Sequence, residues 1–209
     1  LWQEEDSKSY IAQAGPELFL KYTGELLLGT GSAALKEQRA AVVLAPGGSG
    51  ALRVAAEFVT RNAPGTRIFV SDPTWNNHIP LLGSAGLKLE TYPYYAYASH
   101  QLKFDQMMDK LKAAGKGDLV LVHGCCHNPC GADLTREMWQ ALATAAQQQG
   151  FTPFIDLAYQ GLGDGLEDDV YGLRLLAESL PELVIASSYS KNFGLYREQI
   201  GRASCRVRV

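Results

Sequence analysis

One lysine, Lys191, lies among small hydroxyl residues in the stretch SSYSKNFGLY (residues 187–196), directly after an apolar run at 183–186. An amine that is partly withdrawn from water can act as a nucleophile or a base, and it can form an imine with a carbonyl group. Small neighbouring side chains let a ligand approach such an amine closely. A lone lysine is most often a surface cation, so the chemistry of Lys191 depends on the polar groups that the fold brings next to it.

A glycine-rich stretch, GGSGAL (residues 47–52), opens a helical pattern. The backbone N–H groups and the dipole of a helix N-terminus can bind a phosphate. The stretch lacks the Lys-Ser/Thr pair of a P-loop and the spacing of a dinucleotide fingerprint. By itself it favours a plain helix start over a phosphate site.

Apolar runs alternate with helical patterns along the chain, and no internal repeat is present. The pattern predicts a loop at 45–50 and helices at 51–63, at 102–115 (closed by Gly115) and at 134–150 (capped by Thr135 and Gly150). In the first of these helices one buried face is expected to hold Leu52, Ala55, Ala56, Phe58 and Val59. Strands that run into loops are expected at 67–75, 87–95, 118–131, 151–161 and 182–191. This alternation predicts an α/β fold with a mostly parallel sheet flanked by helices.

Polar residues follow four of the expected strands, at 72–78, 123–128, 156–159 and 188–191. Ligands of open α/β sheets bind at the carboxyl ends of the strands, so the four clusters indicate one shared pocket. A phosphate cradle, Lys191 and the strand-end carboxylate of Asp156 together match what pyridoxal phosphate needs. The cofactor requires an amine for a Schiff base, an anion for its pyridinium nitrogen and donors for its phosphate.

Composition excludes several classes of function. The chain has 209 residues, of which 46% are hydrophobic, and a formal net charge of -3, which fits a large globular domain or part of one. No basic patch or apolar run of membrane-spanning length is evident, so neither a nucleic-acid partner nor a membrane is expected. Three of the four cysteines lie too close together for a secreted disulfide framework, which favours a reducing, cytoplasmic compartment.

The stretch HGCCHNPC (residues 123–130) holds five potential zinc ligands in eight residues. A structural zinc site usually takes a second pair of ligands from elsewhere, and only Cys205, His78 and His100 could supply it. We therefore favour buried, metal-free thiols, with a zinc-binding module as the alternative.

Five blocks, in this order and spacing, carry a resemblance to a known family: PGGSGALRVAAEF, SDPTWNNH, HGCCHNPCGADLT, FIDLAYQGLGDGLEDDVYGLR and SYSKNFGLYRE. From about Tyr10 to Glu198 the sequence resembles the class I aspartate and aromatic-amino-acid aminotransferases. The resemblance implies the large domain of the aspartate aminotransferase fold, with pyridoxal 5'-phosphate as cofactor. It also implies transamination between an L-amino acid (aspartate, glutamate or aromatic) and a 2-oxo acid. The quoted blocks are shared by both subgroups.

The resemblance implies a role for each matching residue. Lys191 matches the Schiff-base lysine, Asp156 the aspartate that pairs with the pyridine nitrogen, and Tyr159 the tyrosine that bonds the cofactor's phenolic oxygen. Asn128 matches a residue beside that oxygen and the substrate carboxylate, and Trp75 matches the ring stacked on the cofactor. Phosphate-binding positions are matched by Gly48, Ser49 and Ser188. The histidines that support the aspartate are matched by His78 and His123. Tyr10 resembles a tyrosine that reaches the phosphate of the neighbouring subunit, which implies a homodimer. Trp75 could instead be core packing, and the two histidines could be buried residues without a role at the site.

The sequence departs from the family's pattern in two places. Cys130 stands where the family usually has threonine, and a thiol is a weaker hydrogen-bonding group than a hydroxyl. Gln199 stands where an arginine usually clamps the phosphate. From Ile200 the match stops, and IGRASCR is what one reading frame of a widely used sequencing adapter encodes.

We therefore expect residues 1–198 to be part of the cofactor-binding large domain and residues 199–209 to be a non-native tail. The small domain is expected to be largely missing, and the chain to be a fragment that folds poorly and transaminates weakly or not at all. A non-catalytic cofactor-binding protein remains an alternative, although it would have less need for Lys191, Asp156 and Tyr159 together. Elimination or decarboxylation would use the same three groups, and the family blocks favour transamination.

Overall fold

The computed structural model describes residue 10, residues 12–197 and the backbone of residues 200–206. Within this part of the chain, the main sheet has seven strands in the order β1-β9-β8-β7-β6-β2-β3. They are β1 (Ala40–Pro46), β2 (Arg67–Asp72), β3 (Lys88–Pro93), β6 (Leu119–His123), β7 (Thr152–Leu157), β8 (Val184–Ser188) and β9 (Ile200–Arg206), and a small antiparallel hairpin pairs β4 (Tyr95–Ala96) with β5 (Gln101–Leu102). Only β9 runs antiparallel to its neighbours in the main sheet, which confirms the mostly parallel sheet.

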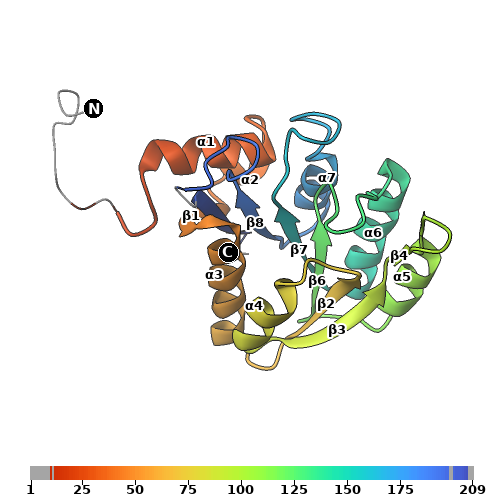
Figure 1. Ribbon diagram of the computed structural model, residues 1–209. Helices are drawn as coiled ribbons and strands as arrows, with labels where there is room; N and C mark the ends of the chain where they lie inside the picture. The colour runs from red at the N-terminus through yellow and green to blue at the C-terminus, as the bar shows by residue number, and fades with distance from the viewer. Residues whose placement is uncertain (1–9, 11, 198–199, 207–209) are drawn as a thin grey trace.

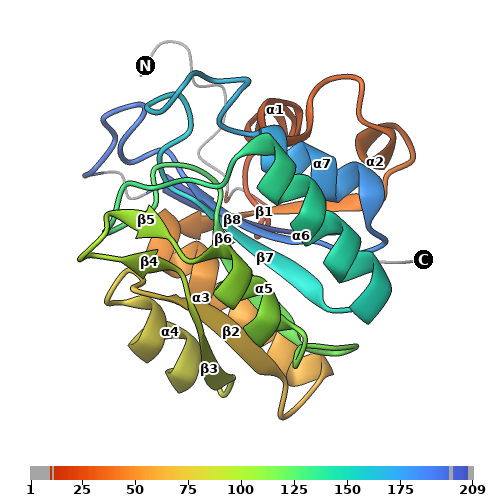
Figure 2. The same cartoon turned by 90° about the vertical axis from the view of Figure 1, so that its right-hand side faces the viewer.

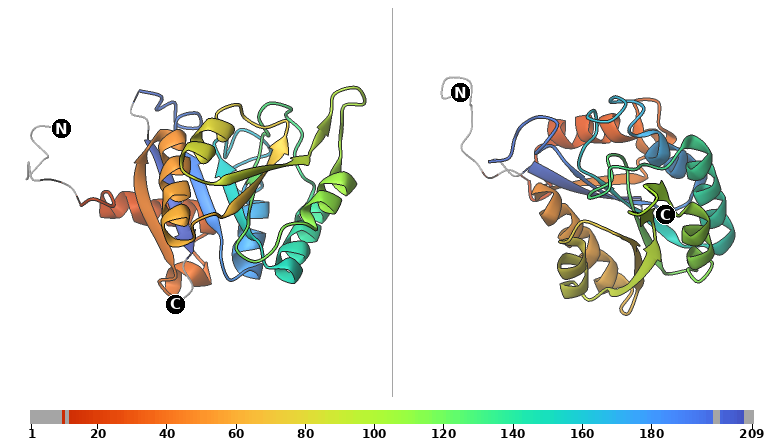
Figure 3. Two further views of the ribbon diagram at one scale, coloured as in Figure 1. Left: turned by 90° about the horizontal axis from the view of Figure 1, so that it is seen from below. Right: turned by 45° about the vertical axis from the view of Figure 1, so that its right-hand side comes forward.

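Helices cover both faces of the sheet (Figures 1 and 2). They are α1 (Glu17–Leu28), α2 (Ala33–Lys36), α3 (Gly47–Asn62), α4 (His78–Ser84), α5 (Phe104–Leu111), α6 (Arg136–Gln149) and α7 (Tyr171–Ser179). Helices α3 and α4 pack in one hydrophobic cluster, and α1, α5, α6 and α7 contribute to the cluster on the opposite face. Figure 3 shows the sheet between these layers. No helix in the described residues is long and apolar enough to cross a membrane.

The alternation of side chains along the strands decides which polar groups face α3. In β7, Phe154 belongs to the α3 cluster, whereas Ile155 and Leu157 belong to the opposite one. Because successive side chains of a strand point to opposite faces, Asp156 lies on the α3 side. His123 of β6 is paired with Asp156 in the sheet register. The carboxyl ends of β6 and β7 therefore direct polar side chains toward one region beside α3.

Two expected element boundaries differ from the structure. Ala45 and Pro46 end β1, and residues 47–50, which were expected in a loop, form the first turn of α3. Helix α5 ends at Leu111 rather than at Gly115, because the Asp118 carboxylate accepts the Gly115 N–H at 2.9 Å and stabilises a turn there.

The caps of α6 are confirmed: Thr135 accepts the Met138 N–H at 3.3 Å, and Gly150 adopts a left-handed φ of 81°. The predicted face of α3 is right for Leu52, Ala55 and Ala56, which are buried. Phe58 is 47% exposed, however. At about 100° per residue, Phe58 lies about 120° around the helix axis from Leu52, at the edge of the buried face rather than at its centre.

Arg174 of α7 holds the C-terminal end of α1. Its guanidinium donates to the Leu27 carbonyl at 3.1 Å and to the Leu26 carbonyl at 3.2 Å, and it pairs with Glu167. A cation at this end satisfies carbonyl groups that have no partner within the helix and complements its dipole. The side chain thus joins α1 to α7 across the layer that covers the sheet.

We predict that Arg174→Met lowers the free energy of unfolding by about 1–3 kcal/mol, because partly buried carbonyl groups lose their donor. The matched control is Arg61→Met, which removes an exposed pair with Glu57 on α3 and is expected to cost about 0–1 kcal/mol. Urea unfolding followed by circular dichroism measures both changes. Equal losses in the two variants would contradict the capping role.

The loop after β6 buries a histidine between two aromatic rings. His127 is 2% exposed and stacks on Tyr94 at 4.1 Å and on His123 at 3.9 Å, measured between ring centroids. Burial, which penalises the charged imidazolium, lowers the pKa of His127 to about 4. An unfolded histidine has a pKa of about 6.5. Below that pH the unfolded chain therefore binds a proton that the folded chain does not.

The free energy of unfolding should consequently decrease as the pH is lowered through a defined window. The contribution of His127 is fully present above about pH 6.5 and is lost as the pH falls toward 4, by up to roughly 3 kcal/mol. Urea unfolding at intervals from pH 7.5 to 4.5 measures this slope. His127→Gln should reduce the slope, because only the contribution of His123 and the acidic groups then remains, and His100→Gln, which changes an exposed histidine, should not. A slope that is identical in all three proteins would exclude His127 as its source.

Candidate active site

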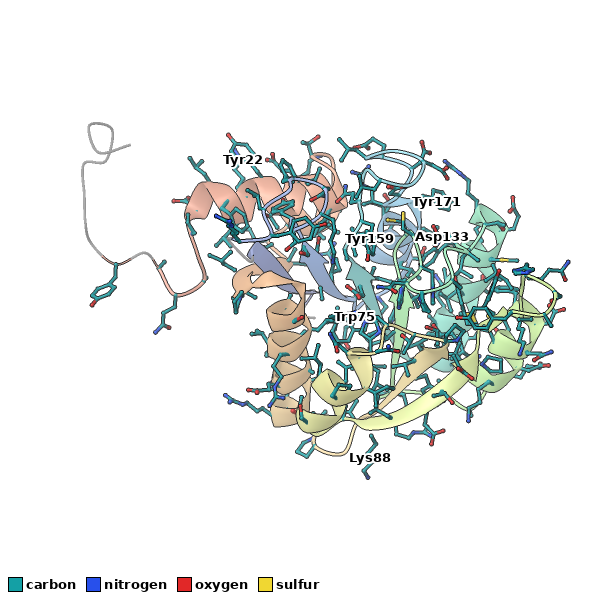
Figure 4. All side chains as sticks on the ribbon, in the orientation of Figure 1. Tyr22, Trp75, Lys88, Asp133, Tyr159 and Tyr171 are labelled. Atoms are coloured by element: carbon teal, nitrogen blue, oxygen red, sulfur yellow. The ribbon has the colours of Figure 1, made fainter. Side chains whose placement is uncertain are left out.

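A cavity of about 210 Å³ lies at the carboxyl ends of β6, β7 and β8, beside the first turn of α3. The structure brings nine of the predicted site residues into its lining: Gly48, Ser49, Trp75, His123, Asn128, Asp156, Tyr159, Ser188 and Lys191. Figure 4 shows Trp75 and Tyr159 near the centre of the molecule. His78 lies behind Asp156, and Tyr10 is fully exposed and outside the cavity.

The first turn of α3 forms one wall of the cavity. Its N-cap residue, Pro46, has no side chain that could bond the N–H groups of this turn. These groups therefore remain as donors toward the cavity, and the helix dipole adds positive potential. A Cβ atom at Gly48 would lie 3.2 Å from the Cβ of Ser188, so glycine permits the close approach of the two segments. Ser188 in turn bonds Ser190, with 3.1 Å between their hydroxyl oxygens. The arrangement suits an anion such as a phosphate.

Asp156 also lines the cavity, and His78 holds its carboxylate in place. Its Oδ2 atom lies 2.9 Å from Nε2 of His78, whose side chain is completely buried. The other ring nitrogen of His78, Nδ1, lies 2.7 Å from the Thr74 hydroxyl. A carboxylate with a side-chain exposure of 13% needs such a fixed partner, because burying an unpaired charge is costly.

His123 extends this set of hydrogen bonds. Its Nδ1 accepts the backbone N–H of Asn128 at 3.1 Å, and its Nε2 lies 3.4 Å from the Thr74 hydroxyl. A neutral ring that accepts at Nδ1 carries its hydrogen on Nε2. Burial, together with the neighbouring His127 and His78, lowers the pKa of His123, which favours that neutral form. His123 therefore donates to Thr74, and the Thr74 hydroxyl can donate to His78.

Lys191 and Tyr159 meet inside the cavity. The Lys191 Nζ atom lies 5.0 Å from the centre of the Tyr159 ring, within the range of a cation–π contact. The Asn128 amide donates to the Tyr159 hydroxyl at 3.5 Å. Trp75 is half-buried and packs edge-on against His78, with 5.4 Å between ring centroids. An amine, a carboxylate, a phenol and an anion cradle thus line one cavity, which could bind a flat anionic ligand with a reactive carbonyl group.

Several residues of the site were not predicted. Thr74 connects the two histidines, and the sequence signal for it was a hydroxyl four residues before His78 in SDPTWNNH. Ser190 belongs to the hydroxyl-rich stretch around Lys191, and the other unpredicted lining residues are Leu52, Cys125, Ala158 and Tyr196. Cys125 and Ala158 lie within the clusters at 123–128 and 156–159 that predicted the pocket, whereas Leu52 and Tyr196 had no such signal.

Several groups of the stretch 123–130 take part in hydrogen bonds, and the side chain of Cys205, a candidate second ligand, lies outside the described part of the chain. Cys125, Cys126 and Cys130 are free thiols, and the Asp133 carboxylate accepts the backbone N–H groups of Cys126 and His127. Across the described ranges, no three His, Cys, Asp or Glu side chains form a group that could hold a metal ion.

The departures near the C-terminal end lie partly outside the described residues, which include neither Glu198 nor Gln199. The backbone of residues 200–206 forms β9, which lies between β1 and β8. This placement concerns the backbone, and the non-native origin of residues 199–209 stays a prediction.

Comparison with known proteins gives one consistent result. The family model described as aminotransferase class I and II matches residues 3–209. The aspartate aminotransferase of Escherichia coli (strain K12) is 48% identical over 201 residues, which are 96% of this chain and 51% of that protein. The aromatic-amino-acid aminotransferase of Paracoccus denitrificans is 48% identical over 199 residues, 95% of this chain and 50% of that protein. The chain thus spans about half the length of the curated relatives that it matches.

Solved structures of aspartate and aromatic-amino-acid aminotransferases also resemble this chain. The aromatic-amino-acid aminotransferase from Burkholderia pseudomallei, described as covalently bound to pyridoxal phosphate, superposes with a TM-score of 0.95 at 33% identity, over 99% of this chain and 52% of that one. The cytoplasmic aspartate aminotransferase of Saccharomyces cerevisiae gives a TM-score of 0.93 at 31% identity, over 99% of this chain and 51% of that one. The predicted fold and the predicted resemblance are both confirmed, and the chain belongs to the class I and II aminotransferase family.

Proposed function

We propose that the protein represented by this chain is a pyridoxal-phosphate-dependent aminotransferase. It exchanges an amino group between an L-amino acid (aspartate, glutamate or aromatic) and a 2-oxo acid. The observation that carries the proposal is the single cavity that joins Lys191, the His78-bound Asp156 and the uncapped start of α3. Family membership and the quoted relatives, which include aspartate and aromatic-amino-acid aminotransferases, support the same activity.

The residues of the cavity fit the cofactor. The first turn of α3 with Gly48 and Ser49, together with Ser188, would hold the phosphate, because these residues supply donors at an uncapped helix start. Asp156, bonded to His78 through Oδ2, keeps a second oxygen for a protonated ring nitrogen. Trp75 would pack against the ring, and Tyr159 with Asn128 would bind its phenolic oxygen. When bound, the cofactor supplies a ring that delocalises negative charge from the substrate Cα.

Lys191, Asp156 and Tyr159 each perform a different step of the proposed reaction. The Lys191 amine would anchor the cofactor and, once released, would take the proton from the substrate Cα and pass it to C4′ of the cofactor. Asp156 holds a proton at the ring nitrogen, and His78 keeps the carboxylate in position for this task. Tyr159 donates a hydrogen bond to an oxygen beside the reacting centre, in reach of the Asn128 amide. A non-catalytic binding protein would have no use for this base at the substrate.

We also propose that the full protein is a homodimer that works in the cytoplasm. The support for the dimer is that Tyr10, which the resemblance places at a neighbouring subunit's phosphate, is fully exposed and outside the cavity of its own chain. The support for the compartment is the three free thiols of the described residues.

The proposed tail has its own test. We propose that residues 199–209 are not encoded by the natural gene and that Gln199 stands in place of an arginine. Sequencing the source gene across the codon for Glu198 is expected to show the family's arginine and a longer reading frame. A natural coding sequence for GRASCRVRV would contradict the proposal.

The proposed function predicts selective labelling of one lysine. Pyridoxal phosphate added to the purified chain, followed by borohydride reduction and peptide mapping, should place the reduced adduct on Lys191. Lys191→Ala should lose this adduct, whereas Lys112→Ala, which removes a lysine with a side-chain exposure of 73%, should retain it. Adducts scattered over several lysines would count against an organised site in this chain.

A further inference from the structure

The distance between Lys191 and Tyr159 is set beyond the sheet. The register that pairs β7 with β8 ends at Leu157 and Ser187. Both Lys191 and Tyr159 follow this last pair, on the loops that leave the two strands. Yet the Lys191 Nζ atom lies 5.0 Å from the centre of the Tyr159 ring. Because the ladder of the sheet does not extend to either residue, their contact depends on hydrogen bonds between the two loops.

Asn192 provides such a hydrogen bond. Its side-chain Nδ2 donates to the backbone carbonyl of Gln160 at 3.0 Å. The two bonded residues directly follow Lys191 and Tyr159 in the chain. A backbone carbonyl can only accept, so the nitrogen of the Asn192 amide, and not its oxygen, must face Gln160. The direction of this hydrogen bond is therefore fixed by the chemistry of its acceptor.

Gln160 is itself held in place. It is 1% exposed, and its side-chain amide donates to the Leu166 carbonyl at 3.0 Å and to the Leu26 carbonyl of α1 at 3.4 Å. Arg174 donates to the same Leu26 carbonyl at 3.2 Å. The loop after β7 is thus attached to the end of α1. The hydrogen bond from Asn192 attaches the loop after β8 to the same place.

The turn around Lys191 couples its position to that of Asn192. The Gly194 N–H donates to the Lys191 carbonyl at 3.2 Å, on the C-terminal side of the lysine. On the N-terminal side, the Ser190 N–H donates to the Ser188 hydroxyl at 3.1 Å. These hydrogen bonds close the turn on both sides of Lys191, so a shift of Asn192 moves the lysine as well.

We propose that Asn192 is a positioning residue of the candidate active site. Its hydrogen bond to Gln160 sets the distance between the Lys191 amine and the Tyr159 hydroxyl, so that both groups reach the same ligand. Asn192 is not among the described residues that line the cavity, and it acts through its neighbours. The inference rests on the proposed function, because this distance matters only if Lys191 binds pyridoxal phosphate beside Tyr159.

The hydrogen bond can be tested in the unaltered chain. In ¹H–¹⁵N spectra, the side-chain amide protons of Asn192 are assigned through their bonds to the backbone. Their exchange with water is compared with that of Asn76, whose side chain is exposed. We expect slower exchange for Asn192, because a hydrogen-bonded proton exchanges only when its bond opens. Equal exchange of the two amides would overturn the proposal, and this result does not depend on how any variant folds.

The positioning role is tested by the rate at which pyridoxal phosphate and borohydride label Lys191. Asn192→Leu keeps the size of the side chain and removes its donor. It should slow the labelling by about tenfold or more, because reaction rates fall steeply when a reacting group is misplaced. The matched control is Asn62→Leu, which removes an exposed amide that donates to the Phe58 carbonyl on α3 at 2.7 Å. This control should label Lys191 at the unaltered rate. An unaltered rate in Asn192→Leu would overturn the role.

A second readout separates positioning from a loss of stability. The absorbance of bound pyridoxal phosphate changes with pH as its imine nitrogen gains or loses a proton. Tyr159, by donating to the neighbouring phenolic oxygen, favours the unprotonated imine. Asn192→Leu should therefore shift the midpoint of this change to higher pH. Reduced stability alone would lower the amount of bound cofactor and leave the midpoint in place, and an unmoved midpoint would exclude the positioning role.

These outcomes are separable from the proposed function. If Lys191 of the unaltered chain is not labelled, the proposed function fails, and the role of Asn192 fails with it even where its amide protons are protected. If Lys191 is labelled at the same rate with and without the Asn192 amide, the role of Asn192 alone fails and the proposed function stands.

Discussion

The hydrogen bond between His78 and Asp156 is the interaction on which the candidate site depends. A carboxylate that is largely withdrawn from water needs a fixed donor, because its desolvation is otherwise uncompensated. His78, completely buried at the start of α4, supplies that donor at 2.9 Å. Thr74 and His123 orient the ring from the other side. The position of α4 against the sheet is therefore coupled to the position of the one charged group at the end of β7.

The sheet makes this coupling possible through its register. Pairing of His123 with Asp156 brings the ends of β6 and β7 level, and alternation turns both side chains toward α3. The same face holds the N–H groups of the first turn of α3. An anion cradle, a fixed carboxylate and Lys191 consequently line one small cavity. A ligand that has an anionic end and a cationic end matches this distribution of charge.

Much of this arrangement was predictable from local pattern, and the exceptions have physical causes. Thr135 and Gly150 were identified correctly because capping depends on a few adjacent residues. Gly115 was misread as a cap because the competing partner, Asp118, belongs to a turn stabilised by its side chain. Gly47 to Gly50 were expected in a loop because glycine disfavours helices, yet they form the first turn of α3, where Gly48 lies close to Ser188. Thr74 was overlooked because its role exists only where β2, α4 and β6 meet.

The tautomer of His123 is decided by a group of fixed direction. The backbone N–H of Asn128 can only donate, so Nδ1 of His123 accepts and the ring carries its hydrogen on Nε2. Burial lowers the pKa of His123 and so favours the neutral state that this direction requires. A protonated ring would place a hydrogen on the nitrogen that has to accept. The hydrogen bonds that hold Asn128 and orient His78 behind Asp156 are thus maintained only while His123 remains neutral.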